Sequence, residues 1–534
     1  ELPYYMIPSV FIELEKIPLN TNGKIDKSSL RVVTNNENIE ITDEVISCVV
    51  DAFKEVLNQD VVLIDDDFVS LGGNSLSAMK LQLLLNERLD VSLSSNELIG
   101  LSTPQEIANH IRFNLNVRST VDEEKYTFDE HCPLSESQLN VYLDESVNDM
   151  GTAYNNPFKI DFKDNYSAGE IKDALIKLFE AFPILKARVL NDGGVLSFAF
   201  DAEPEIIEGS LNDMHSFVRK FEFDKCLSRF LVADEGTSII LCADFHHLIF
   251  DGTSLNILLN KLASILDNED SDFIDKGALR QIAFEEIIDS DYMDNAREFF
   301  DDMLADNNEV YGLLPSLNGT DEEFELIDTF DMDMEYLSSF LQNHSITYNQ
   351  FFTSVFAYAL SRFTGSDKVL FNIIEDGRGH IDLSKSVGMF VKTLPVLMDC
   401  KNQDINSYLK YSSNLINSVM KYDLYPFRIL ASDYDLNSNI LFQYSHNLFS
   451  DVINKEDLKY SVDELEHDLN ADLSFYIFNN GENRLTIRIL YSSIYSKNFI
   501  EHFNQSYKLI LNEMIRVGEL KEIDYISNRD IELR

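Results

Sequence analysis

The sequence has no tryptophan, few basic side chains and no long apolar run. Its 43 Lys and Arg stand against 92 Asp and Glu, which gives a formal net charge of −49 at pH 7. Such a charge repels nucleic acid and anionic membranes. No apolar run approaches the ~18 residues that a membrane helix needs, and the first residues show neither a basic segment nor an apolar signal core. We therefore expect a soluble, cytoplasmic protein with no nucleic-acid or membrane partner.

Cysteine is scarce as well. The five cysteines are odd in number, scattered and never arranged as CxxC, at positions Cys48, Cys132, Cys226, Cys242 and Cys400. A disulfide framework would need an even set, and a zinc ribbon would need paired thiols. The pattern argues against both, and we expect buried cysteines that act as small hydrophobic side chains.

The chain does contain enough apolar side chain for several packed cores, since 45% of its 534 residues are hydrophobic. Its length allows about three or four domains. Two polar stretches without hydrophobic periodicity, residues 31–42 and 116–128, divide it into an N-terminal piece, a small middle part and a large remainder. We therefore predict a multidomain protein.

The middle part, residues 37–116, has the periodicity of an all-helical domain. Apolar residues recur at helical spacing in the stretches 43–57 and 75–89, and a third stretch, 103–115, begins with Thr103 as a possible cap followed by Pro104. Gly72 and Gly73 form a turn that delivers Ser75 to a helix start, where free amides and the helix dipole suit a phosphate ester. The alternative is that Asn74 or Ser75 merely caps this helix.

This stretch resembles the signature of peptidyl carrier proteins of nonribosomal peptide synthetases, Leu-Gly-Gly-x-Ser-Leu. The matching residues are Leu71, Gly72, Gly73, Asn74, Ser75 and Leu76. The resemblance implies a four-helix bundle in which Ser75 carries 4'-phosphopantetheine and, through it, an aminoacyl or peptidyl thioester. Asn74 and Leu76 would support that site. Leu76 and Met79 would form a docking patch for partner domains, or would belong to the core.

The first 36 residues resemble the end of an adenylation domain. The segments Leu2–Pro8 and Asn22–Lys27 follow that family's Leu-Pro-x-Tyr-Met-Ile-Pro and Asn-Gly-Lys-x-Asp-Arg patterns, with Lys24 at the catalytic lysine and Lys27 in place of arginine. No Gly-rich phosphate loop precedes them, so we expect this remnant to be inactive as an adenylating enzyme. The last residues, SNRDIELR, resemble the start of a following adenylation domain.

The stretch FHHLIFDGTS, residues 245–254, combines two histidines with an Asp-Gly pair between a buried strand at 238–245 and a helix that Thr253 or Ser254 could cap. A metal site is disfavoured, because adjacent histidines at a strand end point to opposite sides and no third ligand lies nearby. A serine hydrolase triad is disfavoured too, because Ser254 lacks the strained glycine elbow that presents the serine in hydrolases. We expect His246 to be a core residue and His247 to handle a proton.

HHLIFDG matches the His-His-x-x-x-Asp-Gly motif of condensation domains, which resemble chloramphenicol acetyltransferase, have two α/β lobes and form the peptide bond. Five other stretches agree with that family in order and spacing: PLSESQLNVYL, FEFDKCLSRF, VGMFVKTLP, YPFRIL and ILFQYSH. The resemblance implies a linker at 117–128, an N-terminal lobe at 129–303, and a C-terminal lobe with the start of a further linker at 304–534.

The resemblance also implies roles for the motif residues. His247 Nε2 would accept a hydrogen bond from the attacking amine, with His246 beside it, Asp251 holding the loop and Gly252 leaving room for the pantetheine arm. In AFPILKARV, Lys186 replaces the arginine expected to pair with Asp251. Lys392 replaces an asparagine of the family, and either alters the floor of the substrate tunnel or is a solvated side chain.

Two other functions remain as alternatives. An epimerization domain shares the double histidine, and the stretch IIEDGRGHID offers Glu375, Gly377, Arg378 and His380 in a similar place, but such domains have tryptophan where this chain has VGMFVKT. A degenerate domain that only docks carriers would not need His247 and Asp251 intact. Cyclization domains replace both histidines with aspartates, which disfavours that class.

We therefore expect a peptide-bond-forming enzyme of an assembly line. Its partners would be a downstream peptidyl carrier protein, adenylation domains of the same assembly line, a phosphopantetheinyl transferase and aminoacyl or peptidyl thioesters. Because no epimerizing domain lies between the carrier and the condensation domain, the donor and the acceptor are both expected to be L-configured.

Overall fold

The structure is a computed structural model that describes most of residues 44–524. The described ranges are 44–68, 71–73, 75–89, 91, 93, 101, 103–120, 125–148, 150–163, 166–236, 238–268, 273–305, 325–344, 346–401, 404–434, 436, 439–445, 460–465, 468–479 and 483–524. The segment expected to be an adenylation remnant and Asn74 lie outside them. No helix of the described ranges is long and apolar enough to cross a membrane.

The small middle part is helical, as its periodicity predicts. The described helices here are α1 (Glu44–Leu57), α2 (Ser75–Leu89) and α4 (Pro104–Thr120). They enclose one core in which Val49, Phe53, Leu85 and Ile107 are fully buried. The expected cap of α4 is confirmed, because Thr103 Oγ1 accepts from the backbone N–H of Glu106 at 3.2 Å.

A first lobe is built on a five-stranded sheet in the order β12-β2-β7-β6-β5. Its strands are β2 (Asn155–Lys163), β5 (Glu205–Gly209), β6 (Ser228–Asp234), β7 (Ser238–His246) and β12 (Tyr460–Glu464). Helices α6 (Ala168–Ala181) and α8 (Gly252–Leu266) pack against each other, and α6 also packs on β6. A small second sheet joins β1 (Cys132–Pro133), β4 (Val195–Ala199) and β3 (Arg188–Asp192).

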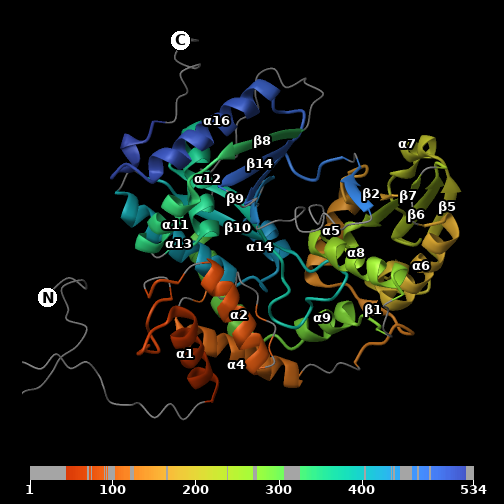
Figure 1. The fold of residues 1–534 in the computed structure, drawn as a ribbon, viewed down its shortest axis with the longest axis horizontal. Helices are drawn as coiled ribbons and strands as arrows, with labels where there is room; N and C mark the ends of the chain where they lie inside the picture. Colours follow the sequence, from red (N-terminus) through yellow and green to blue (C-terminus); the bar gives the residue numbers. More distant parts are fainter. Residues whose placement is uncertain are drawn as a thin grey trace, which may run out of the picture.

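A second lobe is built on a six-stranded sheet in the order β10-β9-β11-β13-β14-β8. Its strands are β8 (Glu325–Asp331), β9 (Lys368–Glu375), β10 (Lys392–Asp399), β11 (Ile440–Ser445), β13 (Leu473–Asn479) and β14 (Arg484–Tyr491). Its helices include α11 (Met334–His344), α12 (Tyr348–Thr364), α13 (Ile405–Lys421) and α16 (Lys497–Met514). Figure 1 shows this lobe in green to blue beside the yellow first lobe, with the carrier-like helices below.

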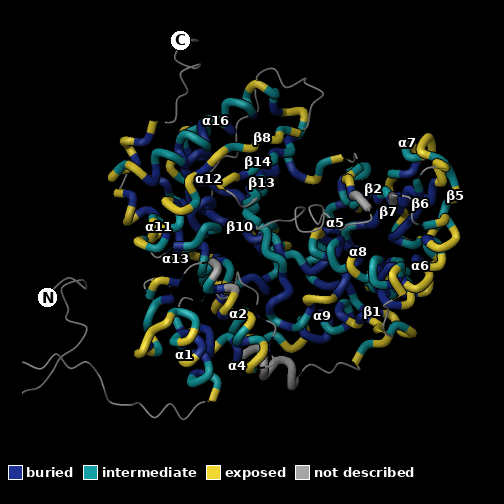
Figure 2. Tube along the Cα trace, in the orientation of Figure 1, coloured by how far each residue is buried: buried dark blue, intermediate teal, exposed yellow. Residues whose placement is uncertain are grey.

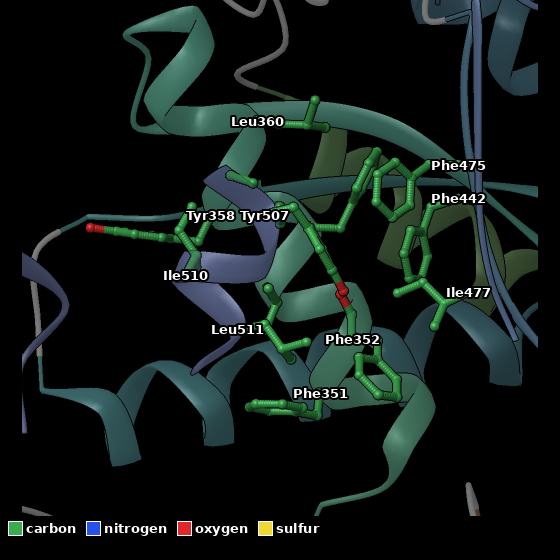
Figure 3. Packing of buried hydrophobic residues seen from close by; sticks show 14 of the residues in the cluster. Phe351, Phe352, Tyr358, Leu360, Phe442, Phe475, Ile477, Tyr507, Ile510 and Leu511 are labelled. Atoms are coloured by element: carbon green, nitrogen blue, oxygen red, sulfur yellow. The ribbon is translucent and has the colours of Figure 1, made fainter. Parts of the chain in front are cut away.

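Helix α12 is the centre of the second lobe. It contacts α13 and α16 as well as strands β9 and β11, and an unbroken stretch, residues 350–361, is buried. A helix that is buried all round needs apolar or small side chains on every face. Figure 3 shows Phe351, Phe352 and Tyr358 of α12 among Phe442, Phe475, Tyr507 and Leu511 of neighbouring strands and helix. Figure 2 shows the same pattern along the chain, with buried segments at the centre of each lobe and exposed ones at its rim.

The remaining elements connect these layers. They are α5 (Glu136–Val147), α7 (Met214–Phe217), α9 (Gly277–Glu285), α10 (Ser290–Leu304), α14 (Phe427–Tyr434) and the 3-10 turns η2 (Pro183–Lys186), η3 (Leu211–Asp213), η4 (His247–Ile249) and η6 (Leu520–Glu522).

Two segments from the C-terminal half of the chain pack into the first lobe. Strand β12 comes between β11 and β13 in the sequence, yet it pairs with β2 of the first lobe, in register from Tyr460 opposite Phe162. The loop between β9 and β10, residues 376–391, also reaches the first lobe, since Val387 and Met389 belong to that lobe's core. The predicted boundary between the lobes, at residues 303 and 304, assigns both of these segments to the C-terminal lobe.

Candidate active site at the junction of the lobes

The double histidine lies where the central strand of the first lobe ends. Strand β7 runs to His246, the turn η4 holds His247, and α8 begins at Gly252. The strand and the helix are where the hydrophobic periods predict them. The predicted cap was wrong, because Asp251 caps α8 in place of Thr253 or Ser254. Its backbone is extended and its Oδ1 accepts from the N–H of Ser254 at 2.9 Å, a geometry that aspartate favours.

His246 is fully buried, as expected of a core residue. Its Nδ1 accepts from the backbone N–H of Leu248 at 3.0 Å, and its Nε2 lies 2.7 Å from Glu145 Oε2. An N–H can only donate, so Nδ1 carries no proton and Nε2–H donates to Glu145. Burial lowers the pKa of His246, and the carboxylate of Glu145 opposes that shift. His246 is therefore a neutral ring held at both nitrogens.

His247 is half-buried, and its ring nitrogen Nδ1 is engaged. Its Nδ1 lies 2.8 Å from the carbonyl oxygen of Phe250. Because a carbonyl only accepts, Nδ1 carries the proton, and in the neutral ring Nε2 keeps its lone pair. Its backbone N–H donates to Tyr154 O at 2.7 Å, which fixes the start of the turn. This tautomer presents the acceptor nitrogen that a role in handling an amine proton requires.

Asp251 is buried and both of its carboxylate oxygens are engaged. Oδ1 lies 2.6 Å from Arg378 Nη2 and 2.8 Å from Ser254 Oγ, and Oδ2 accepts from the backbone N–H of Phe390 at 3.0 Å. A buried carboxylate with a paired guanidinium and three further donors is satisfied and rigid. Asp251 therefore shapes the loop, and its oxygens are taken up by these partners.

The partner of Asp251 was predicted wrongly. Lys186, at the end of η2, was expected to pair with it, but Asp251 pairs with Arg378 from the loop between β9 and β10. Lys186 lies instead near Cys226, where its charge opposes the rise in the thiol pKa that burial causes. The planar fork of Arg378 also donates to Leu383 O and Ser386 O, a set of bonds that a lysine cannot make.

The loop that carries Arg378 crosses from the second lobe to the first. Gly388 N–H donates to Ser254 Oγ at 3.0 Å, and the Arg378 guanidinium lies over the ring of Phe390 at 4.5 Å. Gly377 has φ of 65°, and a Cβ there would collide with Phe390 O. Arg378 had been noted for its place in an epimerization-like stretch; here it clamps Asp251.

The structure also describes the motif glycine, Gly252, and the replaced residue Lys392. Gly252 opens α8 and is exposed, which is consistent with an approach to this helix end. Lys392 is a buried side chain, 8% exposed, and its Nζ lies 3.2 Å from Glu285 Oε1. Glu285 Oε2 in turn accepts from the backbone N–H of Glu136 at the start of α5. Lys392 thus forms an ion pair between the lobes. The alternative that it is a solvated side chain was wrong.

The carrier-like helices place Ser75 at the first position of α2. Gly72 before it has φ of 97°, and a Cβ on Gly73 would meet the ring and carbonyl of Phe68, so the turn needs glycine at both positions. The side chains of Ser75, Leu76 and Met79 lie outside the described atoms. The turn brings the chain to a helix N-terminus, as the sequence predicts.

Helix α4 approaches the loop between β9 and β10 at His110. The rings of His110 and His380 have centroids 6.0 Å apart. His380 Nε2 lies 2.9 and 3.0 Å from the two oxygens of Asp423. Burial raises the pKa of Asp423, but the charge and hydrogen bond of His380, with Lys392 and His110 nearby, hold it below its ordinary value. His380, which also falls in the epimerization-like stretch, therefore has its Nε2 engaged by Asp423.

Several residues of the site were not found from the sequence. Glu145, Tyr154 and Phe390 hold the motif although they lie far from it in the chain. Arg378 stands in the stretch IIEDGRGHID, which was noted for another reason, but nothing in the sequence told which aspartate it meets.

The fold and this junction define a two-lobed α/β domain with a histidine turn between its lobes and a helical carrier-like domain before it. A family model described as "Condensation domain" matches residues 129–532. A model described as "Phosphopantetheine attachment site" matches residues 48–111. The chain belongs to the condensation domain family and carries a phosphopantetheine attachment domain in front.

Curated relatives and solved structures agree with the two family matches. Gramicidin S synthase 2 of Brevibacillus brevis is 26% identical over 478 residues, which cover 83% of this chain and 10% of the relative. Bacitracin synthase 1 of Bacillus licheniformis is 22% identical over 580 residues, covering 99% of this chain and 11% of the relative. The chain therefore spans about a tenth of the length of these relatives.

The starter condensation domain of the rhizomide synthetase RzmA has a TM-score of 0.61 at 14% identity, covering 74% of this chain and 100% of that chain. This likeness shows the fold, two α/β lobes like those of chloramphenicol acetyltransferase, as the resemblance implied.

Proposed function

We propose that this chain forms peptide bonds between thioester-bound amino acids in nonribosomal peptide synthesis. The carrier would hold the donor on phosphopantetheine attached to Ser75. The acceptor amine, on a downstream carrier, would attack the donor carbonyl. The new C–N bond replaces the C–S bond, and the amine proton leaves as the pantetheine thiol is released.

The observation that carries this proposal is the tautomer of His247. Nδ1 is tied to Phe250 O, so Nε2 is the nitrogen that can accept a hydrogen bond from the attacking amine. A positioned acceptor either removes the proton or orients the amine, and both raise the rate by holding the reactants in line. Asp251, with both oxygens engaged, keeps the loop in shape, and Gly252 leaves the helix end open for the pantetheine arm.

The finer features of the assembly line belong to the same proposal. Residues 1–36 are the end of an adenylation domain, a proposal that rests on the segments Leu2–Pro8 and Asn22–Lys27. The carrier is a four-helix bundle, which the single core shared by α1, α2 and α4 supports. Asn74 and Leu76 flank the modified serine. The partners are a phosphopantetheinyl transferase, a downstream carrier and adenylation domains. Donor and acceptor are L-configured, and a cytoplasmic location stays a prediction.

The first test is the intact mass of the protein after incubation with coenzyme A and a promiscuous phosphopantetheinyl transferase. One added phosphopantetheine that is absent from Ser75→Ala supports the attachment site. Loading with an L-aminoacyl coenzyme A and adding a panel of L-aminoacyl pantetheine acceptors should then give a dipeptide. No addition to the folded wild type, or no dipeptide with any acceptor of the panel, would contradict the proposal.

A further inference from the structure

We propose that Glu145 is a positioning residue for His247, acting through His246 and the turn η4. This inference rests on the proposed function, because it assigns Glu145 a part in the same reaction. Glu145 lies in the last turn of α5, and its side chain is 3% exposed. A carboxylate at such a depth is costly unless a donor satisfies it, and the donor here is His246 Nε2–H.

His246 passes this restraint to the turn that carries His247. One nitrogen of its ring donates to Glu145, and the other accepts from the N–H of Leu248, the second residue of η4. The rings of Phe221 and Phe223 pack on it edge-on, with centroids 5.7 and 5.5 Å away. With both nitrogens bonded and its faces packed, the ring of His246 cannot turn without breaking the cap of η4.

Helix α5 holds η4 at a second point. Gln138 Nε2 donates to Leu248 O at 2.9 Å, so the N–H and the carbonyl of Leu248 are both tied, directly or through His246, to α5. Gln138 and Glu145 are two helical turns apart on one face of α5. The capping box of Ser135 and Gln138 fixes the start of this helix. Helix α5 therefore restrains the backbone of η4.

Asp144, the residue before Glu145, supports His247 through Tyr154. Asp144 Oδ2 accepts from Tyr154 O–H at 2.6 Å, and Tyr154 O accepts from the backbone N–H of His247 at 2.7 Å. The Tyr154 ring lies 6.4 Å from each histidine ring. Asp144 thus fixes Tyr154, which holds the backbone of His247, and Glu145 fixes His246, which caps the turn. The direction of His247 Nε2 follows from both.

The test uses the whole chain, loaded with an L-aminoacyl donor, and an L-aminoacyl pantetheine acceptor that the wild type uses. Glu145→Ala should lower the maximal rate by about 10- to 100-fold, because a misplacement of about 1 Å has that cost. The acceptor concentration for half-maximal rate should stay within about twofold, since Glu145 does not touch the acceptor. Glu145→Gln, whose Oε1 still accepts from His246, should recover most of the rate.

A matched control is Glu180→Ala, which removes an exposed carboxylate from helix α6 and should leave the rate unchanged. A second readout does not depend on activity. In 15N-histidine-labelled protein, His246 should be the Nε2–H tautomer and His247 the Nδ1–H tautomer, and Glu145→Ala should give a mixture at His247. If Glu145→Ala does not fold, Tyr154→Phe tests the same scaffold, with a smaller loss of rate and the same mixing.

The outcomes separate the two proposals. An active wild type, an inactive His247→Ala and a Glu145→Ala that keeps the wild-type rate and a single His247 tautomer would overturn the positioning role alone. An inactive wild type would contradict the proposed function, and the tautomer spectra would still decide whether Glu145 orders the turn.

Discussion

The two ends of the HHLIFDG motif are held in different ways. The histidine end is fixed within the first lobe, by Glu145 and Tyr154. The aspartate end is fixed across the lobes, because Asp251 meets Arg378 and Phe390 from the second lobe's loop. His247 keeps a half-exposed ring with an accepting nitrogen, while Asp251 has no oxygen left over from these partners. One motif therefore combines a group for chemistry with a group that joins the lobes.

Breaking the aspartate end should have the largest effect on stability. Arg378→Met keeps the length of the side chain but leaves the buried carboxylate of Asp251 without its cation. Such a loss costs about 3–5 kcal/mol of unfolding free energy, measured by urea denaturation. Arg188→Met is the control, because its Asp201 partner is exposed and the same change there should cost about 0–1 kcal/mol. Equal effects of the two variants would show that the interlobe pair is not a clamp.

The sequence could predict the local parts of this comparison. The switch of hydrophobic period at residues 245–254 predicts a strand, a turn and a helix, and the structure has β7, η4 and α8 there. It could not predict that Arg378 replaces Lys186 as partner, or that β12 joins the first lobe. Those contacts join residues more than a hundred positions apart, and local period carries no information on them.

A smaller effect is expected at Ser254, which joins the cap of α8 to the crossing loop. Its buried hydroxyl lies within hydrogen-bond distance of Asp251 Oδ1 and of both backbone groups of Gly388. Ser254→Ala should cost about 1–3 kcal/mol of unfolding free energy, because buried polar partners lose their bonds. Ser146→Ala on exposed α5 surface should change it by less than about 0.5 kcal/mol. A Ser254→Ala as stable as the wild type would remove this residue from the lobe junction.

The histidine end should show itself in the pH dependence of stability. Burial holds the pKa of His246 below its ordinary value of about 6.5, while Glu145 opposes the shift and His247 and Arg229 add to it. The unfolded chain takes up a proton at about pH 6.5, and the folded one does so only at lower pH. The stability from His246 is thus present above pH 6.5 and is lost as pH falls below it.

His246→Asn keeps an acceptor for the N–H of Leu248 and removes the titration. Urea denaturation from pH 8 to 5.5 should show the wild type losing its advantage over His246→Asn by up to about 1.4 kcal/mol per pH unit below 6.5. A constant difference across this range would mean that folding does not lower the pKa of His246.

The most direct test of the account is the rate of dipeptide formation by His247→Ala beside its urea midpoint, in protein loaded with phosphopantetheine and donor. Removing a positioned proton acceptor should lower the rate by about 10²- to 10⁴-fold. The midpoint should fall only slightly, by the loss of the Nδ1 bond to Phe250 O, because within the described residues the hydrogen bonds of His247 go to Phe250 and Tyr154 of the first lobe. A folded His247→Ala that condenses at the wild-type rate would contradict the assignment of the chemistry to this end of the motif.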